Sequence, residues 1–306
     1  MIGDTLDGFL QASVRTATPL MIAALGEMVV ERAGLINIGL EGVIIVGAFA
    51  ALAAASQSDP VFGYVAAIGA GMAIAGVFGF FTLYLRANQI ITGTAITLLG
   101  LGVTGTLHRA SFGIPGAEIS IAPATVGALP VLGSIPLVGP ALFTQPTITY
   151  AMYLLVPCIW FVMYRMHAGL ALRAVGENPE AAIAVGIRAR RVQLAAVLFG
   201  GAMGGLAGGT LVLVQVGSFA EGMSAGRGFV AIAIVALGRW HPMGVALAAA
   251  LFGAATALQF LLQAMGWSLS YQLFLTIPYV LTLITLASTR GQSSAPAGLS
   301  GGDFTR

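Results

Sequence analysis

The stretch GENPEAAIAVGIRARR, residues 176–191, is the most polar part of a chain that otherwise consists of long apolar segments. Of the 306 residues, 58% are hydrophobic and only 8% are charged, compared with about 25% charged residues in a typical soluble domain. A soluble fold of this size would need more polar surface, so the composition predicts a polytopic membrane protein. The apolar segments are continuous and do not alternate with polar residues, which favours an all-α helix bundle over a β-barrel.

A helix needs about 20 apolar residues to cross a bilayer, and the sequence predicts about eight spans plus one broken or half-length helix. We expect spans at 16–30, 36–55, 61–85, 89–107, 147–164, 192–216, 243–265 and 271–288, and a half-span at 229–237. The Gly- and Pro-rich stretch 108–146 is typical of a long external loop. The chain then divides into a transmembrane domain, 1–289, and a Gly/Ser/Pro-rich tail, 290–306, which we expect to be disordered and cytoplasmic.

Basic residues indicate the orientation of the chain. Five arginines fall within the polar segment 165–191, and short loops rich in basic residues stay in the cytoplasm. We therefore expect 165–191 to be cytoplasmic, and the loop 108–146 and the acidic N-terminus to be external. The N-terminus has no basic region of the kind that precedes a cleavable signal, so the first apolar segment should direct insertion itself.

Several chemistries find no support in the sequence. All 13 basic residues are Arg, so the chain lacks the Lys with which a Walker A loop holds the phosphates of ATP. No His, Cys or carboxylate pattern has metal-ligand spacing, and a net charge of +2 does not suggest a nucleic-acid partner. Ser224 lies in a formal G-x-S-x-G pattern, but this pattern joins two membrane segments and lacks the strand-to-helix context of a hydrolase.

The quoted stretch contains the local signals of a short helix. Asn178 is a good N-cap and Pro179 suits the first helical position. Glu177 and Glu180 place negative charge at the positive end of the helix dipole, and Gly186 is a natural stop. We expect a two-turn helix over 179–185. An isolated helix this short is marginal in water, so it needs a packing partner, unless the stretch is an ordinary cytoplasmic loop that happens to be helical.

Four stretches of the sequence resemble one family. The pattern Glu180-Ala181-Ala182-x-x-x-Gly186 resembles the EAA-type coupling motif of ABC importer permeases, although the Leu-Pro ending of the long form is missing. Three further stretches resemble permeases of the branched-chain amino acid and simple-sugar class, and most closely the shorter permease of nucleoside importers: ERAGLINIGLEGVIIVGAF (31–49), ANQIITGTAITLLGLG (87–102) and GMSAGRGFVAIAIVALGRWHPMG (222–244).

The resemblance implies a transmembrane permease subunit of a bacterial inner-membrane importer, without enzymatic activity or a cofactor of its own. A second permease would complete the pathway as a heterodimer in the lipid bilayer, two separate ATPase subunits would bind the ATP, and an external binding protein would deliver a nucleoside or simple sugar. The ATPases would dock on the coupling segment, through Gly176, Glu177, Asn178, Pro179, Glu180, Ala181, Ala182 and Gly186.

Polar residues at membrane depth are candidates for the substrate pathway, because such positions are costly and usually functional. Asn37 and Glu41 are the first two candidates, and the alternative is that they lie at helix ends. Asn88, Gln89 and Thr92 are the others, and the alternative is that they bond to their own helix or join helices. A stand-alone secondary transporter is the rival function; it would need midplane ionisable residues and a clear internal repeat, and the sequence has few of the former and no clear repeat.

Overall fold

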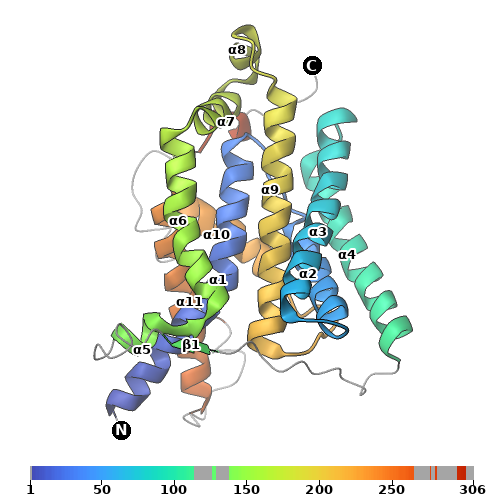
Figure 1. Cartoon of the computed structure of the whole chain (residues 1–306). Helices are drawn as coiled ribbons and strands as arrows, with labels where there is room; N and C mark the ends of the chain where they lie inside the picture. Colours follow the sequence, from blue (N-terminus) through green and yellow to red (C-terminus); the bar gives the residue numbers. More distant parts are fainter. Residues whose placement is uncertain are drawn as a thin grey trace.

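The structure, a computed structural model, describes residues 2–113, 126–128, 138–264, 276, 280 and 295–300. Within these residues the chain is an all-α bundle of membrane-spanning type, as the composition predicts (Figure 1). In the part of the chain that the structure describes, six helical segments are long and apolar enough to cross a membrane: Leu6–Arg32, Pro60–Tyr84, Gln89–Ser111, Thr147–Arg165, Ala189–Val216 and Pro242–Ala264. The span expected at 271–288 lies outside the described residues, apart from 276 and 280.

The helices are α1 (Ile2–Arg32), α2 (Leu40–Ala55), α3 (Pro60–Gly79), the π-helical η1 (Phe80–Tyr84), α4 (Gln89–Phe112), α5 (Val138–Phe143), α6 (Thr147–Arg165), α7 (His167–Glu177), α8 (Pro179–Ala184), α9 (Ala189–Thr210), the π-helical η2 (Leu211–Val216), α10 (Arg227–Leu237), α11 (Pro242–Ala264) and α13 (Ala297–Ser300). Two short strands, β1 (Val126–Ala128) and β2 (Thr144–Pro146), pair antiparallel with Val126 opposite Pro146. The stretch 108–146 therefore contains local structure, and the described part of the tail contains α13.

Helix α9 lies at the centre of the bundle, against α1, α2 and α3 (Figure 1). Small residues allow this packing. A Cβ on Gly71 of α3 would lie 2.8 Å from the Cα of Gly205 on α9, and a Cβ on Gly47 of α2 would lie 2.5 Å from the same atom. Side chains would keep these backbones apart, whereas glycines let membrane helices approach closely and gain van der Waals contact.

The second predicted span begins later than its apolar sequence suggests. Residues 35–37 are not helical, and α2 starts only at Leu40. Side chains of other helices accept the backbone N–H groups of this segment: the Ile36 N–H donates to Gln89 Oε1 (2.8 Å), and the Asn37 N–H donates to Glu27 Oε1 (2.8 Å). Non-helical backbone at membrane depth is tolerated where protein satisfies it, so the first four residues of this span, 36–39, are non-helical and the other sixteen form α2.

A second break precedes α10. The π-helical end of α9 stops at Gly217, whose φ is 79°, and the chain returns through an irregular segment, 217–226, before α10 begins at Arg227. Helix α10 has only 11 residues. The half-length helix predicted from the sequence is therefore confirmed.

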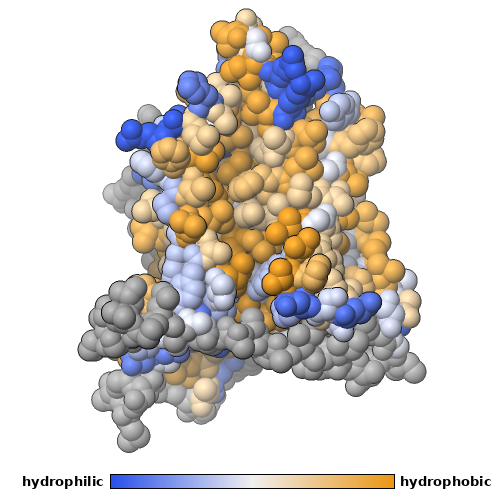
Figure 2. All heavy atoms as spheres, in the orientation of Figure 1, coloured by the Kyte–Doolittle hydropathy of each residue, from blue (hydrophilic) through white to orange (hydrophobic). Residues whose placement is uncertain are grey.

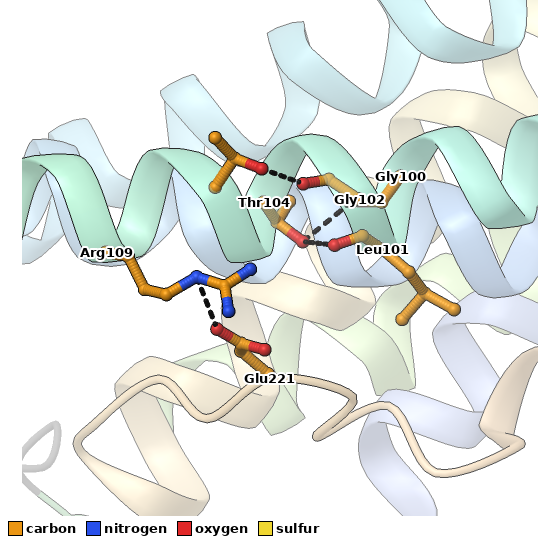
Figure 3. A network of polar contacts seen from close by, with 7 residues as sticks. Gly100, Leu101, Gly102, Thr104, Arg109 and Glu221 are labelled. Carbon is orange, nitrogen blue, oxygen red and sulfur yellow. Dashed lines mark hydrogen bonds and ion pairs between the residues drawn. The ribbon is translucent and has the colours of Figure 1, made fainter. Parts of the chain in front are cut away.

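The surface separates into apolar and polar zones. Figure 2 shows hydrophobic residues over the middle height of the molecule and hydrophilic residues gathered near its two ends. At the end opposite α8, Arg109 of α4 pairs with Glu221 of the segment 217–226, with Nε and Oε1 3.4 Å apart (Figure 3). Both side chains are at least half exposed, so this ion pair contributes little to stability.

Candidate functional site

The polar segment forms two short helices at one end of the molecule, α7 and α8 (Figure 1). Asn178 caps α8 as predicted: its Oδ1 accepts the Ala181 N–H at 3.0 Å. Gly186 follows the helix with φ 88°, a left-handed conformation that favours glycine. Ala182 is 3% exposed and packs in a small apolar cluster with Val175 and Ala189. The short helix is therefore held by one face against its own chain.

The other face of α8 is open. Ile183 is 59% exposed and Val185, directly after the helix, is 77% exposed. Glu180, Ala181 and Gly186 are exposed too. Helix α8 lies at one end of the molecule, beyond its hydrophobic middle (Figures 1 and 2). An apolar surface in such a place is typical of a protein–protein contact.

A groove of about 690 Å³ lies beside α8. One wall contains the predicted coupling residues Glu177, Asn178, Pro179 and Glu180, and the opposite wall contains residues 86–90 between η1 and α4. Two of the residues expected in the substrate pathway, Asn88 and Gln89, therefore lie beside the coupling segment. The sequence did not predict this neighbourhood, because the two walls are about 90 residues apart in the chain.

The polar groups at the start of α4 are used within the protein. Asn88 caps α4, with its Oδ1 accepting the Ile90 N–H (2.9 Å) and the Ile91 N–H (3.2 Å). Gln89 holds the non-helical segment before α2 through its Oε1. Thr92 Oγ1 donates to the Asn88 carbonyl at 2.8 Å. These contacts agree with the alternative given above, in which such side chains bond to their own helix or join helices.

Glu41 lies in the first turn of α2 and is 6% exposed. Its carboxylate accepts two backbone N–H groups at the beginning of α10: Gly226 donates to Oε1 (2.8 Å) and Gly228 donates to Oε2 (2.7 Å). Asn37, three residues before α2, is 1% exposed, and its amide N and O have no partner among the described residues. Glu41 thus joins the two broken segments, while the Asn37 amide retains hydrogen-bonding capacity inside the bundle.

The other end of α10 is also held by the stretch that precedes α2. Trp240 Nε1 donates a hydrogen bond to Glu31 Oε2, and Arg32 Nε donates to the Trp240 carbonyl at 2.9 Å. Glu31 is 2% exposed. The stretches 31–49 and 222–244 each stand out in the sequence. Their contact with each other could not be predicted, because a pairing across about 200 residues leaves no local signal.

Comparison with known proteins assigns the chain to a family. The family described as branched-chain amino acid transport system / permease component matches residues 9–286. The chain belongs to this permease family.

Two relatives show how far the permease sequence resembles known transport subunits. It is 37% identical over 267 residues to TsgC13 of Haloferax volcanii, named as a glucose ABC transporter permease. The aligned region covers 86% of this chain and 80% of that protein. It is 32% identical over 295 residues to the guanosine ABC transporter permease NupQ of Bacillus subtilis. Here the aligned region covers 93% of this chain and 92% of NupQ. A second permease of each organism also matches, TsgB13 at 31% and NupP at 28% identity.

The fold of the permease agrees with this family. A solved ABC transporter of the metal-chelate type, in an inward-facing conformation, superimposes with a TM-score of 0.52 at 14% identity, covering 91% of this chain and 84% of that one. The chain is thus a multi-pass membrane protein and a permease component of an ABC transporter, a transport subunit and not an enzyme. Ser224, the serine of the formal G-x-S-x-G pattern, is fully buried, and its Oγ has no partner among the described residues.

Proposed function

We propose that this permease is the shorter membrane subunit of an ATP-driven importer for a nucleoside or a simple sugar. A separate ATPase docks on α8, a second permease completes the translocation pathway, and an external binding protein delivers the substrate. The ATP is bound by the ATPase, and this chain needs no cofactor. The observation that carries the proposal is α8 itself, a capped helix at the polar end of the molecule with an exposed apolar face.

The physical argument for docking rests on how α8 is built. Its six residues are too few to be stable alone, but the Asn178 cap and the buried Ala182 hold it in place. A preformed helix loses little entropy on binding. Ile183 and Val185 then offer apolar area to a groove on the partner, while Glu180 remains at the positive end of the helix dipole.

The relatives support the partners and the substrate class. In Haloferax volcanii and in Bacillus subtilis, two different permeases match this chain, which is the arrangement that a heterodimeric pathway requires. Their names mention glucose and guanosine, and the nucleoside permease NupC of Lactococcus lactis is 32% identical. Sugars and nucleosides share a ring with several hydroxyl groups, so a polar, uncharged substrate suits a pathway with few charged residues.

The docking proposal is tested by exchanging one exposed residue of α8. The tagged complex is purified in mild detergent from membranes, and its ATPase and second permease are identified by mass spectrometry. Ile183→Glu should remove most of the ATPase while the second permease remains bound. Leu170→Glu is the matched control, because Leu170 on α7 is also 59% exposed, and it should keep the ATPase. A wild-type chain that is purified alone, or an unaffected Ile183→Glu complex, would overturn the proposal.

The substrate class is tested by uptake into proteoliposomes that contain the whole complex and its binding protein. Labelled guanosine, uridine, glucose and leucine are compared with ATP inside and outside the vesicles. Uptake of a nucleoside or a sugar, dependent on ATP at the α8 side, is the expected result. Uptake of leucine alone, or uptake that persists without ATP, would contradict the proposal and favour respectively an amino-acid importer or a stand-alone transporter.

A further inference from the structure

Helix α10 is held at both ends by carboxylates from one short stretch of sequence. Its beginning is bound by Glu41 through two backbone N–H groups, and Trp240, just beyond its end, is bound by Glu31. Both glutamates are almost fully buried. Each of the two carboxyl groups accepts N–H donors at one end of α10, so α10 is held to the region around residues 31–42 at two points.

The contact at Glu41 lies near the middle of the bundle. A Cβ on Gly100, halfway along α4, would lie 2.8 Å from the carbonyl oxygen of Gly42, next to Glu41. A Cβ on Gly204, near the middle of the span formed by α9 and η2, would lie 2.9 Å from the Leu40 side chain. The first turn of α2 therefore meets the beginning of α10 about halfway between the two ends of the long helices.

Two positive helix ends meet at this point. The first turn of α2 contacts Gly228, where a Cβ would lie 2.6 Å from the Glu41 Cα, so the N-terminal ends of both helices, which are the positive ends of their dipoles, lie in one region. The Glu41 carboxylate supplies negative charge and two acceptors there. Without it the N–H groups of Gly226 and Gly228 would lose these acceptors in a region without bulk water, which is costly.

The far end of α10 reaches the segment that leads to α8. The ring of His241 lies 5.4 Å from the ring of Tyr164 at the end of α6, and the Arg173 guanidinium of α7 lies 4.8 Å from the same Tyr164 ring. Helix α7 continues through Asn178 into α8. A chain of direct contacts thus runs from α8, along α7 and Tyr164, to His241 in the turn between α10 and α11.

We propose that α10 transmits movement of the coupling segment to the middle of the translocation pathway, and that Glu41 is the positioning residue at its inner end. In the observed state Glu41 holds the beginning of α10 against α2. When the ATPase moves α7 and α8, α10 shifts and its N–H groups leave the carboxylate, which changes the pathway at mid-depth. The proposal rests on the proposed function, because it requires an ATPase at α8.

The segment before α10 is built to allow this movement. Within 217–226, four residues have left-handed backbone conformations: Gly217, Gly222, Ala225 and Gly226. A Cβ on Gly222 or Gly226 would meet nothing within 4 Å. Helix α10 therefore follows a connection whose backbone turns at four left-handed residues and has open space at two of its glycines, which suits a hinge.

The test replaces Glu41 with Gln in the assembled complex. One amide oxygen can still accept an N–H, but the amide NH₂ then faces the other N–H, donor against donor. Glu41→Gln should keep the ATPase bound and hydrolysing ATP at the wild-type rate while ATP-driven uptake falls at least tenfold. The matched control is Glu221→Gln, the same charge change in an exposed residue of the segment before α10, and its uptake should stay within twofold of wild type.

A second measurement needs neither transport nor the ATPase. Hydrogen exchange of the purified permease should show slow exchange of the peptide covering residues 224–230, and Glu41→Gln should accelerate it at least tenfold while Glu221→Gln does not. Unchanged exchange, or wild-type uptake by Glu41→Gln, would overturn the role of Glu41. Loss of uptake and hydrolysis together, in proportion to less protein, would also overturn it as a purely structural effect. Absence of the ATPase from the wild-type complex would instead contradict the proposed function.

Discussion

At the scale of single residues, the bundle places carboxylates where backbone or indole N–H groups need acceptors. Glu27 holds the Asn37 N–H, Glu31 holds the Trp240 indole and Glu41 holds two N–H groups of α10. Both oxygens of Glu41 accept an N–H, whereas Glu27 and Glu31 each use one oxygen, and the other has no hydrogen-bond partner among the described residues. The hydrogen bonds to these three glutamates hold the broken segments in one arrangement. Removal of a glutamate or of its N–H donor should therefore destabilise the protein.

Trp240→Phe tests this at Glu31. Phe keeps an aromatic ring but removes the N–H donor, which leaves a buried carboxylate without this partner and should cost about 1–3 kcal/mol. The thermal unfolding midpoint of the purified permease in detergent should fall by several degrees. Trp160→Phe is the control, because Trp160 is also half-buried and its ring lies tilted against that of Tyr164, with centroids 6.3 Å apart. Equal shifts for the two variants would show that ring size, and not the hydrogen bond, matters.

Asn178→Ala tests the cap of α8. Loss of the side-chain acceptor for the Ala181 N–H should cost about 1 kcal/mol of helix stability. The free energy of ATPase binding should weaken by the same amount, because the ATPase must then order the helix. ATPase affinity, measured by titration of the ATPase onto purified permease, should fall about fivefold. Asn178→Asp retains an acceptor at the same position and should bind nearly as the wild type does. Equal affinity for Asn178→Ala would mean that α8 is ordered without its cap.

At the scale of helices, the contact between α3 and α9 depends on which face of α3 carries a glycine. Gly71 faces the α9 backbone, and a Cβ there would come within 2.8 Å of the Gly205 Cα. Gly69, two residues earlier on the same helix, has nothing within 4 Å of a Cβ position. Gly71→Ala should destabilise the permease by about 1–3 kcal/mol through overpacking, and Gly69→Ala should be neutral or slightly stabilising. Thermal unfolding of the two variants compares them directly, and an equal response would contradict the packing.

Local signals predicted helices well and the joins between them poorly. The cap and stop of α8 and the half-length of α10 were predictable, because Asn178, Gly186 and a short apolar run act within a few residues. The late start of α2 was not, because the N–H groups of Ile36 and Asn37 are taken by Gln89 and Glu27. For the same reason Glu41 could be recognised as an unusual buried charge, whereas its partners on α10, about 185 residues away, could not.

At the scale of the whole molecule, the arginines separate the two ends. Most of those in described residues lie at the end that carries α8: Arg32, Arg86, Arg165, Arg173, Arg188, Arg190, Arg191 and Arg239. Arg109 lies at the opposite end with Glu221 (Figure 3). Basic residues near span ends stay in the cytoplasm, so we expect the α8 end to face the cytoplasm. The short helix α13 contacts α7, where the Ala297 N–H donates to Glu177 Oε2 at 3.2 Å.

Cysteine labelling tests this orientation. The native thiol, exposed Cys158, is first replaced by Ala, and Arg109→Cys, Val185→Cys and Ala297→Cys are then introduced singly. In spheroplasts, a membrane-impermeant maleimide should modify Arg109→Cys at once and Val185→Cys only after the membrane is opened. Ala297→Cys should behave like Val185→Cys, because α13 lies against the helix that leads to α8. The reverse pattern would place α8 outside, where no ATP is available, and would exclude it as the docking site of an ATPase.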